Sequence, residues 1–234
     1  SGSLDLLHKA IELDPNYAEA LAFGAWAYEQ RFTRGWDEYS ENDLETGGNL
    51  AKRAIETNSE DPLVLVLSGF VLIMSQVDVQ LGLLTTKRAL ENNPNIGFVY
   101  TIGGTALLFV GGNNSEAIQN LEASLSTSPK DPAIFAVYCN LGLAYLESGD
   151  PLKAEEYCQK SIEVNPSWDT GLCGLITVLM ENAKSQDAQL TLERLLSVDG
   201  SASIKKFQES LRIGNQSLKG KMIDALRQVG LPEN

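Results

Sequence analysis

Residues 140–166 read NLGLAYLESGDPLKAEEYCQKSIEVNP, and this stretch decides the fold. Two segments with apolar residues at helical spacing flank a turn at residues 148–150, and a proline closes the second segment. Gly142 and Ala154 are small, as they must be where two antiparallel helices approach closely, and Tyr145 fills the space beside that contact. The stretch therefore predicts a helical hairpin.

The closing phrase of this hairpin recurs along the chain. In each copy a small or apolar residue is followed about five residues later by a proline or by a residue that replaces it. The copies begin at Ala10, Ala54, Ala89, Ser124, Ser161 and Leu195. Successive copies are 34 to 37 residues apart, except for 44 residues between the first two. The sequence is thus a tandem repeat with a period near 34 residues and one insertion.

The repeat predicts an all-α chain in three parts. Residues 1–14 form an orphan second helix of a truncated repeat, and residues 15–200 form five helical pairs with an insertion at 32–48. In residues 201–234 the pattern stops, and 217–229 is expected to be a capping helix that glycine and proline end. The paired helices are expected at 17–32 and 44–57, 63–76 and 79–92, 96–110 and 115–127, 132–148 and 151–164, and 168–182 and 186–198.

Gly142, Tyr145 and Ala154 make the hairpin resemble the tetratricopeptide repeat. Other repeats carry parts of the same pattern: Gly24 and Tyr28, Gly104 and Ala117, and Ala188 and Leu192. They also depart from it, because Gly47 and Gly82 replace the second-helix alanine and Ile176 replaces the first-helix glycine. The resemblance implies a solenoid of helical hairpins with a right-handed superhelix, in which each repeat packs on its neighbours.

The composition excludes several functions. The 234 residues carry a formal charge of −13, and an acidic chain of pI 4.5 is unsuited to nucleic acid or to an anionic membrane surface. The longest apolar run, residues 63–74, is too short to cross a bilayer and is expected to be a buried helix. No signal-peptide pattern opens the chain, and Ser1-Gly2-Ser3 resembles an expression remnant.

Residues that could carry chemistry are few. His8 is the single histidine, and Cys139, Cys158 and Cys173 form no Cys-x-x-Cys motif. The glycine-rich pieces at 103–105 and 111–114 lack the ending of a phosphate-binding loop. We therefore expect a non-catalytic module without metal or cofactor.

The first helix of each pair is expected to line the concave face, where a peptide or a partner helix docks. No lysine or arginine lies in 63–75, 96–110 or 133–148, so an acidic tail is a poor ligand and an apolar segment a better one. An alternative interpretation is that half or more of the candidate residues are core between repeats. The candidates are Trp26, Leu67, Val71, Phe98, Thr101, Thr105, Asn140, Leu143, Glu147 and Thr177.

The insertion is a second candidate surface. It combines Phe32, Trp36 and Tyr39 with five acidic residues, and long insertions in repeat proteins often lie on a binding face. The alternative is that Trp36 folds back on the first hairpin as a local staple.

Charge is unevenly divided along the chain. Residues 201–234 hold six basic and three acidic residues, whereas the rest is strongly acidic. Opposite signs could bring two copies together as a homodimer, and a structural role in self-association is the second functional hypothesis. The alternative is a solvated polar face on the cap.

A narrower resemblance rests on a set of phrases: Asp14-Pro15-Asn16-Tyr17-Ala18, Gly35-Trp36, Pro129-Lys130-Asp131-Pro132 and residues 225–233, ALRQVGLPE. Together they resemble the C-terminal tetratricopeptide region of bacterial adenylate/guanylate cyclase-like proteins, and the similar halves of winged-helix transcriptional regulators. The resemblance implies a regulatory or sensory module for protein partners. It also implies a cytoplasmic or periplasmic setting, with a membrane anchor in the parent protein.

Overall fold

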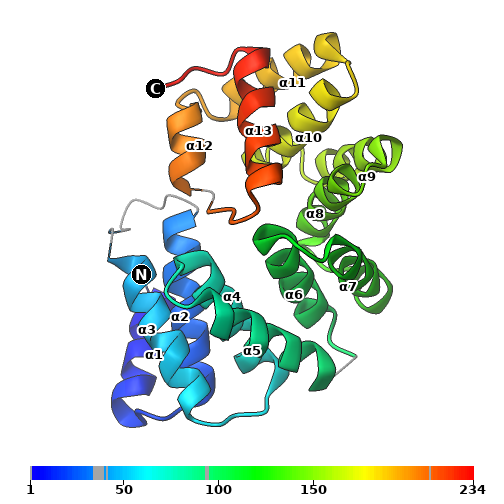
Figure 1. Cartoon of the computed structure of the whole chain (residues 1–234). Helices are drawn as coiled ribbons and strands as arrows, with labels where there is room; N and C mark the ends of the chain where they lie inside the picture. The colour runs from blue at the N-terminus through cyan, green and yellow to red at the C-terminus, as the bar shows by residue number, and fades with distance from the viewer. Residues whose placement is uncertain (1, 34–39, 41, 93–94, 211) are drawn as a thin grey trace. The chain divides into compact units, whose positions relative to one another are not determined.

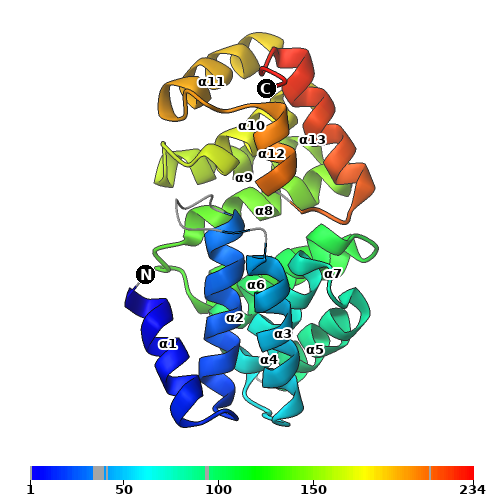
Figure 2. The ribbon, with the colours of Figure 1, turned by 90° about the vertical axis from the view of Figure 1, so that its left-hand side faces the viewer.

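The computed structural model describes residues 2–33, 40, 42–92, 95–210 and 212–234. Within these residues all regular structure is helical, in thirteen α-helices joined mostly as antiparallel hairpins (Figures 1 and 2). The expected all-α class is confirmed. None of the described helices is long and apolar enough to span a membrane. The helices are α1 (Gly2–Leu13), α2 (Ala18–Thr33), α3 (Asp43–Glu56), α4 (Pro62–Ser75), α5 (Val79–Asn92), α6 (Gly97–Val110), α7 (Asn114–Thr127), α8 (Ile134–Glu147), α9 (Pro151–Val164), α10 (Asp169–Glu181), α11 (Ser185–Val198), α12 (Ile204–Ser210) and α13 (Gln216–Val229).

The chain divides into two compact units, residues 1–106 and 107–234. In the first unit, α2 pairs with α3 and α4 pairs with α5, while α1 packs on α2. The centre of this unit is α4, which is buried from Val64 to Ser75 because α2, α3 and α5 pack around it. The apolar run of the sequence is therefore a buried helix, as predicted.

Two glycines lie where the backbones of α4 and α5 come closest. A Cβ atom on Gly69 would lie 2.7 Å from the Gly82 carbonyl oxygen, and a Cβ on Gly82 would lie 2.7 Å from the Gly69 oxygen. Real Cβ atoms do not come that close to backbone oxygen. Gly82, which departs from the expected alanine, is thus explained by a closer approach of the two backbones than an alanine would allow.

In the second unit, α8 pairs with α9 and α10 pairs with α11, and α7 packs on α8. A Cβ atom on Gly142 would lie 2.9 Å from the Ala154 carbonyl oxygen, so the predicted close approach of these two helices is confirmed. Leu141, Leu172 and Ile176 are completely buried in one core cluster that also includes α11 and α13 residues.

The C-terminal region differs from the expectation in one element. The sequence predicts one helix after residue 200, but the structure has two, the seven-residue α12 and then α13. Helix α13 ends at Gly230, whose φ of 98° is left-handed. The tail then returns to α12, where Ile204 N–H donates to the Pro232 oxygen at 2.8 Å. Helix α12 escapes sequence analysis because it is short and has only one completely buried residue, Ile204.

Candidate functional site

In the first unit, the candidate concave residues divide into surface and core. Trp26 on α2 and Phe98 on α6 are half-buried, and their rings meet edge to face with centroids 5.8 Å apart. The buried Trp26 indole N–H has no acceptor among the described residues. An unsatisfied buried donor is rare in folded proteins, which makes this aromatic pair the most distinctive feature of the face.

The other candidates of this unit offer less to a partner. Leu67 and Val71 are completely buried in α4, as the core interpretation of these two positions requires. The hydroxyls of Thr101 and Thr105 donate to carbonyls of their own helix, at 3.2 Å to Gly97 and 2.7 Å to Thr101.

In the second unit, the candidates on α8 and α10 are covered. Leu143 and Thr177 are buried, and the Thr177 hydroxyl donates to the Cys173 oxygen at 2.8 Å. Asn140 is 9% exposed. Part of this covering is α13, which packs on α10 and on α8.

Glu147, at the end of α8, is the polar centre of this contact. Its carboxylate accepts from Lys221 Nζ at 2.8 Å, from Ser217 Oγ at 3.1 Å and from Asn215 Nδ2 at 3.3 Å. The Glu147 side chain is only 10% exposed. The sequence places Glu147 among the candidate partner-binding residues, and the structure pairs it with the chain's own C-terminal helix. Sequence reasoning missed Lys221 as the partner of Glu147, because 74 residues separate the two.

The insertion surface is described only at its edges. Phe32 lies half-buried in the last turn of α2, whereas Trp36 and Tyr39 lie outside the described residues. Beside the insertion, the buried Asp43 carboxylate accepts from Arg31 Nε at 2.7 Å and Nη2 at 2.6 Å, and from Ser40. Burial alone would raise the pKa of Asp43, but these hydrogen bonds outweigh it and lower the pKa below its usual value.

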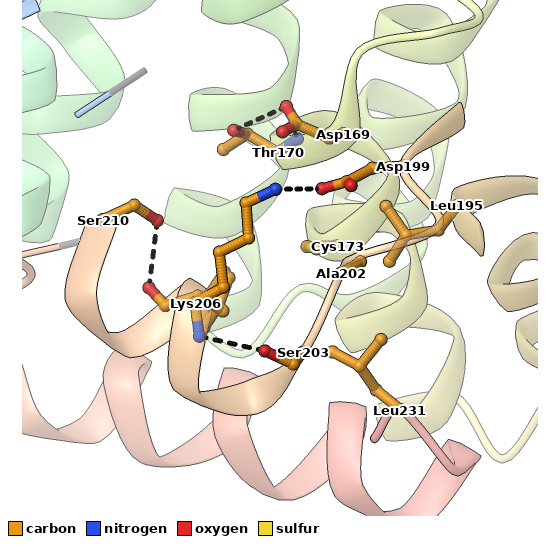
Figure 3. Close-up of a pocket in the computed structure, with 11 residues that line it drawn as sticks. Asp169, Thr170, Cys173, Leu195, Asp199, Ala202, Ser203, Lys206, Ser210 and Leu231 are labelled. Carbon is orange, nitrogen blue, oxygen red and sulfur yellow. Dashed lines mark hydrogen bonds and ion pairs between the residues drawn. The ribbon is translucent and has the colours of Figure 1, made fainter. Parts of the chain in front are cut away.

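A small pocket lies beneath α12 (Figure 3). Its volume is about 50 Å³, and α10, α12 and the chain end line it with residues that include Cys173, Lys206 and Leu231. Lys206 Nζ donates to Asp199 at 2.6 Å and to Ser201 Oγ at 3.0 Å across its rim. That volume suits one or two water molecules and is far below the few hundred Å³ of a typical ligand site.

The three cysteines and Tyr145 are buried in the packing of the second unit. The hydrogen bond to Cys139 and complete burial hold the pKa of the Cys158 thiol well above its ordinary value, and burial does the same for Cys173. Such thiols stay protonated and are poor nucleophiles. Tyr145 stacks on Tyr157 at 5.5 Å and donates to Glu122 at 2.6 Å. The described residues hold no group of three or more metal-ligating side chains.

Comparison with known proteins agrees with this architecture. Residues 135–167 match the model of the tetratricopeptide repeat, the α8–α9 hairpin with its flanks. No curated protein shows significant sequence similarity to the chain. The fold is a tetratricopeptide-type array of helical hairpins.

Solved structures share this fold at low identity. PilW, a widely conserved type IV pilus biogenesis factor, is 15% identical, with a TM-score of 0.62 over 88% of this chain and 92% of its own. Pseudomonas aeruginosa PilF is 17% identical, with a TM-score of 0.58 over 89% of this chain and 91% of its own. YrrB, described as a tetratricopeptide protein with an unusual peptide-binding site, is 15% identical. Its TM-score is 0.53 over 83% of this chain and 93% of its own.

Proposed function

We propose that the chain is a non-catalytic tetratricopeptide module that binds a protein segment on the first helices of its hairpins. In the first unit the docking point is the Trp26–Phe98 pair, which is half-buried and edge to face. Aromatic side chains give large contact area at low entropic cost, and they dominate many interfaces.

The chemistry of this face favours an apolar ligand. The described part of α6 carries no charged side chain, and its two threonine hydroxyls bond within the helix. An acidic peptide would find no cation on α6 to offset the loss of its hydration. An apolar strand or helix would contact Trp26 and Phe98 without that cost.

A finer proposal concerns the parent protein. The phrases of the sequence that resemble cyclase-like proteins support a regulatory module downstream of an effector domain, and a sensory half of a winged-helix regulator is the alternative. Of the similar structures named above, PilW is described as a pilus biogenesis factor and YrrB by a peptide-binding site, and none is described as a cyclase. The sequence phrases are therefore the support for this proposal.

Paired affinity captures test the docking point. The bait proteins are the wild-type chain, Trp26→Ala with Phe98→Ala, and a control, Leu190→Ala, which removes an exposed leucine from the second helix α11. Partners are identified by mass spectrometry, and binding of each purified partner is then measured by calorimetry.

We expect one partner to bind the wild-type and control chains alike and to bind the double variant at least tenfold more weakly, with an unchanged helical circular dichroism spectrum. Equal affinity for all three chains would show that the aromatic pair is not the docking point. A concentration-dependent mass in light scattering would instead favour the self-association module.

A further inference from the structure

The C-terminal helix α13 has the form of a docked amphipathic ligand. Leu218, Met222, Ala225, Leu226 and Val229 follow helical spacing, and each is at most 6% exposed. Asp224, Arg227 and Gln228 lie on the opposite, exposed face. Helix α13 packs mainly on α10 and also contacts α11, α12 and α8. Figure 1 draws α13 beside α10. An amphipathic helix laid on neighbouring helices resembles the helix-in-groove mode of recognition.

The side-chain hydrogen bonds from α13 and its cap to other helices meet largely at one acceptor. The Glu147 carboxylate accepts hydrogen bonds from the side chains of Lys221, Ser217 and Asn215. Asn215 also anchors the start of the helix, since its backbone N–H donates to the Phe109 oxygen at 2.7 Å and its Nδ2 reaches the Leu108 oxygen at 3.3 Å. A lysine three residues beyond the first buried leucine is therefore part of the recognition pattern.

Charge favours the same contact. The region 201–234 has six basic and three acidic residues, whereas residues 107–200, which form the rest of this unit, have five basic and thirteen acidic residues. Attraction between a basic segment and an acidic surface speeds association and weakens with added salt.

A small pocket and an exposed ion pair lie where α12 meets the rest of the second unit. The pocket of about 50 Å³ is lined by residues of α10 and α12, among them Cys173 and Lys206 (Figure 3). The adjoining ion pair, Lys206–Asp199, joins a lysine whose side chain is 52% exposed. An ion pair with so exposed a lysine contributes little to stability. The Lys206–Asp199 pair therefore adds little to the attachment of α12.

We propose that the surface formed by α8 and α10 is a receptor for an amphipathic helix that carries a cation opposite Glu147, and that α13 is its intramolecular occupant. A partner helix with apolar residues at the α13 spacing and a basic residue at the position of Lys221 displaces the α12–α13 segment. This inference rests on the proposed function and deepens it. It names the class of partner that the second unit binds, and it identifies α13 as the helix that covers the binding surface in the absence of that partner.

A synthetic peptide of residues 214–232, labelled with a fluorophore, serves as the probe, and the full chain serves as the receptor. In the wild-type chain α13 fills the surface, so peptide binding is weak. Lys221→Glu places like charges at Glu147 and weakens the chain's own helix without changing the receptor surface. We expect the peptide to bind this variant at least tenfold more tightly than the wild type. Lys219→Glu makes the same charge change on α13 away from Glu147, and it should bind the peptide as the wild type does.

Charge exchange identifies the receptor. The Glu147→Lys chain should bind the wild-type peptide no more tightly than the wild-type chain does. The same variant should bind a Lys221→Glu peptide at least tenfold more tightly than it binds the wild-type peptide. Circular dichroism checks that each variant keeps its helical content, and added salt should reduce every gain. Equal binding by Lys221→Glu and Lys219→Glu would overturn the proposal.

Hydrogen exchange gives a test that does not depend on a peptide. The amides of α13 should exchange through a partial opening, at least tenfold faster than the slowest amides of α8 and α10. Equal protection of α13 and α8 would make α13 an integral part of the core and would overturn the proposal. So would dimers of Lys221→Glu that take up no peptide, because α13 would then be exchanged between copies. A partner that still depends on Trp26 would show that the proposed function survives such a failure.

Discussion

Gly142 is the residue on which the second unit depends most directly. Its missing side chain lets α8 and α9 touch, and an added Cβ would meet the Ala154 oxygen at 2.9 Å and the Cys158 backbone nitrogen at 3.1 Å. Backbone atoms cannot move aside as a flexible side chain can. We expect Gly142→Leu to lower the free energy of unfolding by about 1 to 3 kcal/mol, as overpacking does in well-packed cores. Urea denaturation followed by circular dichroism measures the change.

Gly220 is the matched control. It lies inside α13, and an added Cβ there would have no heavy atom within 4 Å. Because glycine costs a helix interior about 0.5 to 1 kcal/mol relative to alanine, Gly220→Ala should stabilise the chain or leave it unchanged. If both glycine substitutions changed stability by the same amount and in the same direction, the close approach at Gly142 would not be the cause.

Asp43 makes the stability of the first unit depend on pH in the acid range. Its pKa is lowered in the folded state because hydrogen bonds from Arg31 and Ser40 outweigh burial. A lowered folded-state pKa stabilises the fold above the unfolded pKa of about 3.9, and this contribution is lost as the pH falls through the folded value. We expect Asp43→Asn to cost about 1 to 3 kcal/mol at pH 6, since it weakens a charged hydrogen-bond pair.

The pH dependence separates this ion pair from simple packing. The difference in unfolding free energy between the wild type and Asp43→Asn should shrink as the pH is lowered from 6 to 3, because the wild-type carboxylate then becomes protonated. Denaturant titrations at several pH values measure it. A difference that stays constant over this range would mean that the charge of Asp43 does not contribute to stability.

At the scale of the element, helix α4 shows how an N-cap residue stabilises the start of a helix whose other residues are almost all buried. The Asp61 carboxylate accepts from Leu63 N–H at 2.8 Å and Val64 N–H at 3.2 Å, and Pro62 occupies the first turn. We expect Asp61→Ala to cost about 1 kcal/mol and Asp61→Asn to cost much less, since asparagine keeps the accepting oxygen. Thermal unfolding of the two variants checks this, and equal losses would contradict the capping role.

The elements that the sequence predicts well are those specified by local signals. The hairpins follow from helical spacing of apolar residues, from small residues at the contacts and from the prolines that end three of the five pairs. Helices α8 and α9 are accordingly expected within two residues of their observed bounds. Helix α12 and the pairing of Glu147 with Lys221 depend on contacts between residues far apart in sequence. The helical spacing predicts that Glu147 lies on the concave face, but it does not predict which segment contacts it.

The candidate site illustrates the same limit. Periodicity places Leu67 and Phe98 on equivalent first-helix faces, but it does not tell a position covered by the next element from one left partly open. The structure separates them, since Leu67 is completely buried and Phe98 is half-buried against Trp26. The partner-binding role of this face stays a prediction until a ligand is measured.

At the scale of the whole molecule, an array of hairpins is stabilised by contacts between neighbours, and damage to one hairpin should stay local. Gly142→Leu should therefore raise hydrogen exchange strongly in α8 and α9 and in the adjoining α7 and α10, while α2 and α3 in the other unit keep most of their protection. Exchange read by mass spectrometry on peptides from each helix measures the pattern under native conditions. An equal rise in α2, α3 and α8 would mean that the two units open as one cooperative body, in which case stability would not be the sum of local terms.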